Sequence, residues 1–329
     1  MLLLNMADVD SVLDLDALTE AVADALRELS AGRASIPPRV AAEAGNGGLL
    51  AAMPGALPGI GALGAKLVTV FPRNVERPSH QAVVVLFDSD TGTPTALIDG
   101  TLLTATRTAA ASAVATRYLA RPDSRVMAIL GTGVQARAHA LAVRRVCPSL
   151  REIRIAGRDP AKGAALAEEL SARLAHAEIA VITAPTFADA LAGADIVCAT
   201  THSPDPVVRR EWLHRGVHVN SVGFNTAGRE VDAATVLDAV VVVESRGSAL
   251  APIPAGANEL LWPIRDGLIR AEHIHAEIGE LVAGTRPGRT APDQITLYKS
   301  VGVAAEDLAA ATLVVRDALA RGVGTTIDF

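Results

Sequence analysis

One glycine-rich turn in the sequence stands where it could hold a phosphate. Gly131-Thr132-Gly133-Val134-Gln135-Ala136 follows a continuous apolar run at 125–130 and precedes a segment of helical pattern. In that setting the first glycine permits a tight turn, the second lets the backbone approach a pyrophosphate, and a small third residue lets the helix pack on the strand. Phosphate oxygens would receive the unpaired N–H groups of the helix. The motif predicts a dinucleotide site, with a purely structural glycine turn as the alternative.

The residues after the next predicted strand bear on which dinucleotide binds. NAD sites usually carry an acid at the end of that strand, which bonds the ribose 2′-hydroxyl. Here Gly157 occupies the place and Arg158 follows it. Because an arginine can stack on adenine and pair with a 2′-phosphate, the sequence favours NADP over NAD. NAD stays open, since Asp159 could supply the acid if the strand ends later, and Arg158 could be an exposed turn residue.

Three basic residues lie in settings where a solvent-facing charge is not the obvious explanation. Arg39 follows two prolines, Lys66 precedes an apolar strand, and Arg107 lies in an apolar helix. A buried cation needs an anion. An acid of the protein, such as Asp99, could provide it in a structural ion pair, or a substrate carboxylate could complete the set. The residues alone leave both interpretations open.

The elements that must position these residues follow two patterns. Residues 15–32 have helical apolar spacing, 36–98 alternate short apolar runs with Gly and Pro as strands and turns do, and 102–119 predict a buried helix. From 125 onward, strands alternate with helices, which predicts a Rossmann-type α/β fold with a doubly wound parallel sheet. The predicted strands are 125–130, 152–156, 179–182, 196–200, 218–222 and 240–243, and the predicted helices are 161–174 and 187–192.

Composition limits the possible partners. The chain has 329 residues, and 36 acidic against 30 basic side chains give a net charge of -6, which argues against a nucleic acid held by counterion release. Cys147 and Cys198 fit no disulfide framework or zinc site, so we expect two buried thiols and no metal. The N-terminal MLLLN is too short for a signal peptide, and no apolar run reaches the roughly 20 residues of a membrane span. We therefore expect a cytoplasmic protein with no membrane partner.

The sequence resembles the ornithine cyclodeaminase and mu-crystallin family of NAD(P)-dependent enzymes over nearly its whole length. The segments that carry the resemblance occur in the same order as in that family. They are IPPR at 36–39, AKLVTVFP at 65–72, PSHQAVVVLFD at 78–88, ALIDGTLLTATRTAAASAVATRYL at 96–119, LGTGVQARAH at 130–139, ADIVCATT at 194–201 and ITLYKSVGVAAEDLAAA at 295–311. The resemblance implies an α+β substrate-binding and dimerisation domain at 1–120, completed by the C-terminal helix at 303–329. A Rossmann domain at 121–302 lies between, and the implied assembly is a homodimer.

The resemblance also implies roles for individual residues. Arg39, Lys66 and Arg107 match residues that bind the carboxylate of a small amino or imino acid. Three further sets match cofactor contacts: Thr132, Gly133, Val134 and Gln135 at the pyrophosphate, Ala199 and Thr200 on the ribose side, and Lys299, Ser300 and Gly302 near the nicotinamide. The family includes ornithine cyclodeaminases, alanine dehydrogenases, ketimine reductases and a lens protein, so membership alone does not select an activity.

Two departures favour imine reduction. Asn225 stands where similar cyclodeaminases and alanine dehydrogenases carry an aspartate that acts on the substrate nitrogen. An amide can orient a nitrogen but cannot deprotonate an ammonium, and oxidation of an amino acid begins with that deprotonation. Reduction does not need it, because a cyclic imine can arrive already protonated. His80, in Pro78-Ser79-His80-Gln81, matches the mu-crystallin form, where it could donate a proton, bond the substrate or serve only a structural role.

The hypothesis is therefore an NAD(P)H-dependent ketimine reductase acting on a small cyclic 2-imino acid, such as pyrroline-2-carboxylate or piperideine-2-carboxylate. Arg39, Lys66 and Arg107 would clamp the carboxylate, and Asn225 would orient the ring nitrogen. One rival is an ornithine cyclodeaminase or alanine-type dehydrogenase of the same fold. A second is a protein that binds NADPH or another ligand without turnover.

Overall fold

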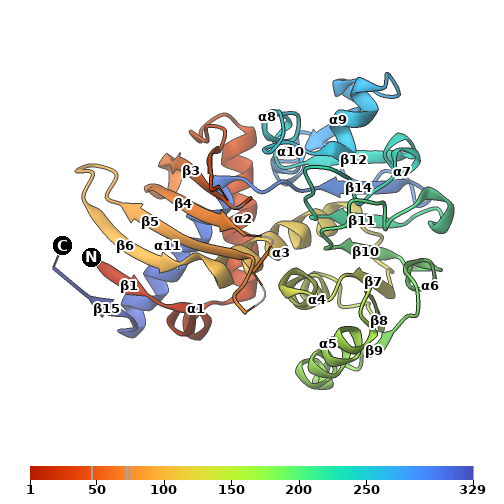
Figure 1. Cartoon of the computed structure of the whole chain (residues 1–329), viewed down its shortest axis with the longest axis horizontal. Coiled ribbons are helices and arrows are strands. Elements are labelled where there is room, and N and C mark those ends of the chain that lie inside the picture. The colour runs from red at the N-terminus through yellow and green to blue at the C-terminus, as the bar shows by residue number, and fades with distance from the viewer. Residues whose placement is uncertain (46, 72, 75, 329) are drawn as a thin grey trace. The chain divides into compact units, whose positions relative to one another are not determined.

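The computed structural model describes residues 1–45, 47–71, 73–74 and 76–328 (Figure 1). Pro72, which closes the lysine-bearing segment of the resemblance, lies outside this set, as does Phe329. The contacts within the chain divide it into two compact units, Met1–Ala111 with Gly302–Phe329, and Ser112–Val301. The first division falls inside helix α3 (Gly100–Leu119) rather than after it, where the sequence predicts the change of domain.

The first unit contains a seven-stranded sheet in the order β15-β1-β6-β5-β4-β3-β2, in which only the β1–β6 pair is parallel. Alternation explains its two faces: Ala62 and Lys66 of β4 are buried, whereas Leu67 is exposed. The strands are β1 (Leu2–Leu4), β2 (Val40–Glu43), β3 (Leu49–Leu57), β4 (Ala62–Val70), β5 (His80–Phe87), β6 (Pro94–Asp99) and β15 (Thr325–Thr326).

Helices cover one face of this sheet. α11 (Ala304–Arg321) packs on β3, β4 and β5, and α2 (Leu15–Ser30) packs on α11. The predicted helix at 15–32 is confirmed, with Asp14 as its N-cap and a buried apolar stripe that includes Leu18, Val22 and Leu26. The remaining helices are α1 (Met6–Val12) and the 3₁₀ turn η1 (Pro58–Ile60).

The second unit contains an eight-stranded parallel sheet in the order β13-β12-β14-β11-β10-β7-β8-β9. The chain winds from β7 to β9 in one direction and from β10 onward in the other, which places a topological switch point between β7 and β10. The predicted doubly wound fold is confirmed. The strands are β7 (Val126–Leu130), β8 (Glu152–Ala156), β9 (Ala180–Thr183), β10 (Ile196–Ala199), β11 (His218–Ser221), β12 (Ala239–Val243), β13 (Ile274–Glu277) and β14 (Ile295–Lys299).

Both faces of the parallel sheet are buried, as its continuous apolar strands require. Alternate residues of β7 belong to different apolar clusters, Met127 and Ile129 to one and Ala128 and Leu130 to the other. The helices are α4 (Val134–Val146), α5 (Pro160–Arg173), α6 (Phe187–Leu191), α7 (Ala233–Asp238), α8 (Arg246–Ala249), α9 (Asn258–Arg265), α10 (Ile278–Val282) and the 3₁₀ turns η2 (Ala175–Ala177), η3 (Arg210–Trp212) and η4 (Ala271–His273).

The two cysteines are buried in this unit. Burial raises the pKa of Cys147 to about 11 and that of Cys198 to about 12, so both thiols stay protonated and unreactive at neutral pH. The prediction of two buried thiols is confirmed. Among the described residues no helix combines the length and apolar character needed to cross a membrane.

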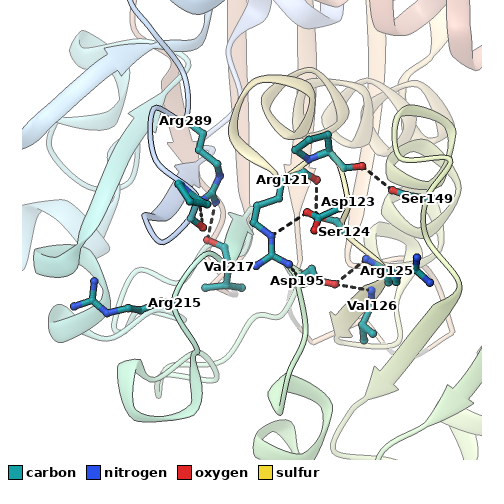
Figure 2. Close-up of polar contacts among 12 residues, drawn as sticks. Arg121, Asp123, Ser124, Arg125, Val126, Ser149, Asp195, Arg215, Val217 and Arg289 are labelled. Carbon is teal, nitrogen blue, oxygen red and sulfur yellow. Dashed lines mark hydrogen bonds and ion pairs between the residues drawn. The ribbon is translucent and has the colours of Figure 1, made fainter.

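Polar contacts fix the amino-terminal edge of the sheet (Figure 2). Asp195 precedes β10 and accepts hydrogen bonds from the backbone N–H groups of Arg125 (2.7 Å) and Val126 (3.0 Å) and from Arg121 Nη2 (2.7 Å). Arg289 donates to the carbonyl oxygens of Leu119 (2.7 Å) and Val217 (3.2 Å). This edge is held by side chains, which leaves the opposite, carboxyl edge to the loops that carry the glycine motif.

Candidate functional site

The glycine turn follows β7 directly and opens α4. Gly131 has a φ of 115°, and a Cβ at this position would lie 2.8 Å from Thr200 Oγ1, so both its backbone conformation and its surroundings require glycine. Gly133 is the N-cap of α4 and supplies no side chain to cap the helix, and a Cβ there would meet nothing within 4 Å. The first turn of α4 therefore has N–H donors without a side-chain acceptor, beside open space.

A cavity of about 240 Å³ lies against this turn. Three loops at the carboxyl edge of the sheet form it, those after β7, β8 and β10, together with Lys162 of α5 and Phe187 of α6. Its lining residues are Gly131, Thr132, Gly133, Gly157, Arg158, Asp159, Lys162, Phe187, Thr200, Thr201, His202 and Ser203. Glycine turn, uncapped helix and cavity together fit a pyrophosphate group of a dinucleotide.

The loop after β8 explains the missing acid. A Cβ on Gly157 would lie 2.7 Å from Thr132 Cγ2, so the glycine turn leaves no room for a side chain there. Asp159 Oδ1 caps α5, accepting from the N–H groups of Ala161 (3.0 Å) and Lys162 (3.3 Å). Arg158 is exposed at the cavity, and no hydrogen bond or ion pair engages its side chain within the described ranges.

The other predicted cofactor residues lie in different settings. Thr200 lines the cavity and donates from Oγ1 to the Leu130 carbonyl (2.9 Å), whereas Ala199 is wholly buried in β10. Val134 is 55% exposed at the start of α4. The Oε1 atom of Gln135 is buried and has no hydrogen-bond partner among the residues that the structure describes, so an acceptor at the start of α4 is left for a donor from elsewhere.

The three predicted cations converge on one segment in the first unit. Lys66 Nζ lies 2.9 Å from Asp307 Oδ1 and 2.8 Å from Oδ2, and Arg107 Nε lies 2.8 Å from Asp307 Oδ1. Arg107 Nη1 also pairs with Glu306, and Arg39 Nη2 donates to the Gly302 carbonyl (2.8 Å). Glu306 and Asp307 are therefore the acids that form ion pairs with these cations, the role for which the sequence suggested Asp99. Asp99 instead accepts from the Thr101 N–H (2.9 Å) at the start of α3.

Arg39, Lys66 and Arg107 form the cation cluster, in which Arg39 is partly exposed and the other two are buried. Lys66 is 2% exposed and Arg107 is 4% exposed. Burial, together with the neighbouring charge of Arg107, lowers the pKa of Lys66 to about 8, although the Asp307 carboxylate opposes the shift. Lys66 therefore remains mostly protonated at neutral pH and can bind an anion.

Lys299 and Ser300 lie at the end of β14 and hold neighbouring strands. Lys299 is 1% exposed, and its ammonium donates to Gly223 O (2.6 Å) and Ser221 Oγ (3.2 Å) and pairs with Glu259 (3.3 Å). Ser300 donates to Glu244 Oε1 (2.5 Å). These two side chains are engaged by the protein itself, and their contact with a cofactor stays a prediction. Gly302, predicted with them, carries the carbonyl that receives Arg39.

Glu230, which sequence reasoning missed, connects two loops of the carboxyl edge. Its carboxylate accepts from Thr201 N and Oγ1 (both 2.9 Å), from Ser221 Oγ (3.0 Å) and from the Gly223 N–H (2.6 Å). Burial raises the pKa of Glu230. Of the missed acids, Glu306 and Asp307 could have been sought as charges inside an apolar segment, AAEDLAAA at 304–311, whereas Glu230 lies among polar residues and gives no such signal.

The two residues predicted to act on the substrate nitrogen have local partners. Asn225 Nδ2 donates to the His202 carbonyl (3.1 Å), and its Oδ1 accepts from the Ala227 N–H (2.8 Å), so this side chain ties the loop after β11 to the loop after β10. His80 is exposed at the start of β5, with Nδ1 3.0 Å from Ser79 Oγ. Both roles remain predictions.

A parallel sheet with a glycine turn at its switch point, joined to an α+β unit with a buried cation cluster, defines a dinucleotide-binding protein of two-unit architecture. The model of the ornithine cyclodeaminase/mu-crystallin family matches residues 1–322. The chain belongs to this family, as the sequence segments indicated.

Relatives support this placement over the full length. The chain is 35% identical to a Delta(1)-pyrroline-2-carboxylate reductase of Bacillus cereus over 336 aligned positions, covering 100% of both chains. The structure of Thermococcus litoralis Delta(1)-pyrroline-2-carboxylate reductase in complex with NADH and L-proline matches with a TM-score of 0.94 and 38% identity, covering 99% of this chain and 100% of that one. An archaeal alanine dehydrogenase dimer with bound NAD matches with a TM-score of 0.89 and 32% identity, covering 100% and 99%.

Proposed function

We propose that this protein reduces a small cyclic 2-imino acid to the corresponding amino acid with a nicotinamide cofactor. The observation that carries the proposal is the cation cluster: Lys66 and Arg107 share the carboxylate of Asp307, and the Lys66 ammonium has Asp307 as its one hydrogen-bond partner within the described part of the chain. The Lys66 ammonium therefore has N–H donors left for a substrate carboxylate. Two relatives that act on pyrroline-2-carboxylate support the same substrate class.

The residues of the chain contribute binding and orientation. Arg39, Lys66 and Arg107 hold the carboxylate and so fix the position of the imine carbon beside it. A bound reduced nicotinamide supplies the hydride. The substrate arrives as a protonated imine, so reduction needs no base, and Asn225 has one amide hydrogen and one lone pair beyond its two loop contacts with which to orient a nitrogen.

The test is an assay of the purified protein with NADPH or NADH and either pyrroline-2-carboxylate or piperideine-2-carboxylate. We expect consumption of the reduced cofactor with formation of proline or pipecolate, and loss of turnover in Lys66→Ala. If the wild-type protein turns over these imines no faster than Lys66→Ala does, the proposal is refuted. Release of ammonia from ornithine, or oxidation of alanine at a rate above imine reduction, would establish the rival activities instead, and binding of cofactor without any turnover would establish a binding protein.

We further propose that the cofactor is NADP(H). Support comes from the loop after β8, where Gly157 replaces the usual acid, Asp159 caps α5, and Arg158 and Lys162 line the cavity. The similar solved structures contain NADH or NAD, so the preference requires its own measurement. Arg158→Ala should raise KM for NADPH by roughly 10-fold while leaving KM for NADH within about twofold. Equal effects on both cofactors would refute the preference.

We propose a homodimer as the assembly. The sheet face of the first unit that α11 does not cover carries exposed apolar side chains on neighbouring strands, and Leu67 pairs directly with Val83. The exposed members are Val40, Leu50, Leu67, Val83 and Leu97. A contiguous apolar face of this kind typically marks an interface, and a similar alanine dehydrogenase is a dimer. Light scattering should give twice the 33.9 kDa chain mass, and Leu67→Glu should give monomers. A monomeric wild type would refute the dimer.

A further inference from the structure

We propose that Asp307 is the positioning residue of the cation cluster, the group that sets Lys66 and Arg107 side by side for the substrate carboxylate. The inference rests on the proposed function. Asp307 Oδ1 accepts from both cations, 2.9 Å from Lys66 Nζ and 2.8 Å from Arg107 Nε. One carboxylate oxygen thus fixes the distance between the two cationic groups, which lie on different elements, β4 and α3.

The surrounding segment extends this arrangement to the whole cluster. Residues 302–307 carry a partner for each cation: the Gly302 carbonyl for Arg39, Glu306 for Arg107, and Asp307 for both Lys66 and Arg107. Glu306 and Asp307 lie in the first turn of α11, whose N-cap Val303 offers no side-chain cap. Their negative charges are favoured at that end of the helix. The start of α11 therefore acts as the framework on which the cation cluster is assembled.

Asp307 orients Lys66 without saturating it. An ammonium has three N–H donors, and Asp307 is the one acceptor that Lys66 has among the described residues. A side chain 2% exposed has little access to water for the remaining donors. The geometry thus leaves N–H donors of Lys66 for a ligand anion.

This arrangement has a consequence for pH dependence. The charged groups that face Lys66 are Arg39, Arg107 and Asp307, and Asp307 alone among them favours the protonated amine. Removing the carboxylate therefore lowers the pKa of Lys66 further below its value of about 8, and Lys66 becomes neutral within the working pH range.

The experiment compares Asp307→Asn with Asp317→Asn, a matched change in the same helix at a residue whose carboxylate pairs with the adjacent Arg316 (2.8 Å). Two quantities are measured: kcat/KM for imine reduction against pH, and the Lys66 pKa by NMR of labelled lysine side chains. Asp307→Asn should lower kcat/KM at pH 7.5 by roughly 10- to 100-fold, mainly through KM, and shift the alkaline limb to lower pH. Asp317→Asn should match the wild type.

A loss that is equal at every pH, with an unchanged Lys66 pKa, would overturn the proposal, because it would mean that Asp307 serves only the fold. If Asp307→Asn does not fold, Asp307→Glu replaces it: KM should rise while the Lys66 pKa stays near the wild-type value, and an unchanged KM would count against positioning. The NMR titration needs no substrate. A wild type without imine reductase activity would therefore refute the proposed function while the titration still decided the role of Asp307.

Discussion

Two buried lysines show how differently the two units use the same side chain. Lys66 on β4 is 2% exposed and Lys299 on β14 is 1% exposed, and each is paired with a carboxylate. Lys299 has three partners, Glu259, Ser221 and the Gly223 carbonyl, which engage its donors fully. Lys66 has the single carboxylate of Asp307 within the described residues.

Because the two lysines are nearly equally buried, the number of protein partners, rather than burial, distinguishes the fully engaged Lys299 from Lys66, which keeps donors for a ligand. A satisfied buried charge stabilises the loops it connects, whereas its removal leaves the partners unpaired. A buried ammonium with unused donors lowers stability unless an anion accepts from them. Substituting each lysine should therefore affect different properties of the protein.

Lys299→Met should have the largest effect on stability. The substitution leaves Glu259 and the Gly223 carbonyl buried without their cation, which should lower the free energy of unfolding by about 3–5 kcal/mol. Urea denaturation of the purified protein measures it. Lys162→Met, at an exposed position of α5, is the matched control and should stay within about 0.5 kcal/mol of the wild type. Equal stabilities of the two variants would mean that Lys299 does not stabilise the loops it contacts.

Lys66→Met should show the opposite pattern. The free energy of unfolding should stay level or rise, because Asp307 keeps Arg107 and because a lysine whose pKa is about 8 when folded, against 10.5 ordinarily, costs stability. That cost is greatest below pH 8 and disappears above pH 10.5. At the same time kcat/KM for the imine should fall about 100-fold or more, since a buried ion pair with the carboxylate is lost. Unfolding measurements and steady-state kinetics on one preparation test the expected stability and the expected loss of kcat/KM. A destabilised variant with normal kinetics would mean that Lys66 is the structural lysine.

Much of this arrangement could be predicted from the sequence because it depends on local patterns. Strands and helices follow from apolar periodicity, and the glycine turn is recognisable because Gly131, with a φ of 115°, requires glycine and Gly133 directly precedes a helix. The basic residues Lys66 and Arg107 could be singled out because a charge inside an apolar segment is unusual.

The partners of those charges could not be predicted. Asp307 lies 241 positions from Lys66, and no local pattern selects it over Asp99. Lys299 occupies an apolar strand much as Lys66 does, and the family resemblance implies a ligand contact for both, so only their three-dimensional neighbours distinguish them. Asn225 likewise matches a catalytic position by sequence, while its loop contacts with His202 and Ala227 depend on tertiary folding.

Glu230→Gln offers the smallest and most specific test of the Lys299 region. Glu230 accepts four hydrogen bonds from Thr201, Ser221 and Gly223, and an amide can accept at only one of its two ends, so the change should cost about 1–3 kcal/mol at pH 5. Burial raises the pKa of Glu230 above its ordinary 4.5, so the folded state holds this proton more tightly than the unfolded state does. Its contribution to stability therefore falls as pH rises from 4.5 through the raised pKa.

Glutamine has no such titration, so the stability difference between wild type and Glu230→Gln should narrow as the pH increases. Urea denaturation at a series of pH values from 5 to 8 follows the difference directly, with Glu152→Gln, at the partly exposed start of β8, as the control. A difference that widens with pH would mean that the four donors and Lys299 keep Glu230 ionised in the folded protein. In that case Lys299 would lie in a network of ion pairs that stays charged from pH 5 to 8. The difference between the fully partnered Lys299 and the incompletely partnered Lys66 would then be larger.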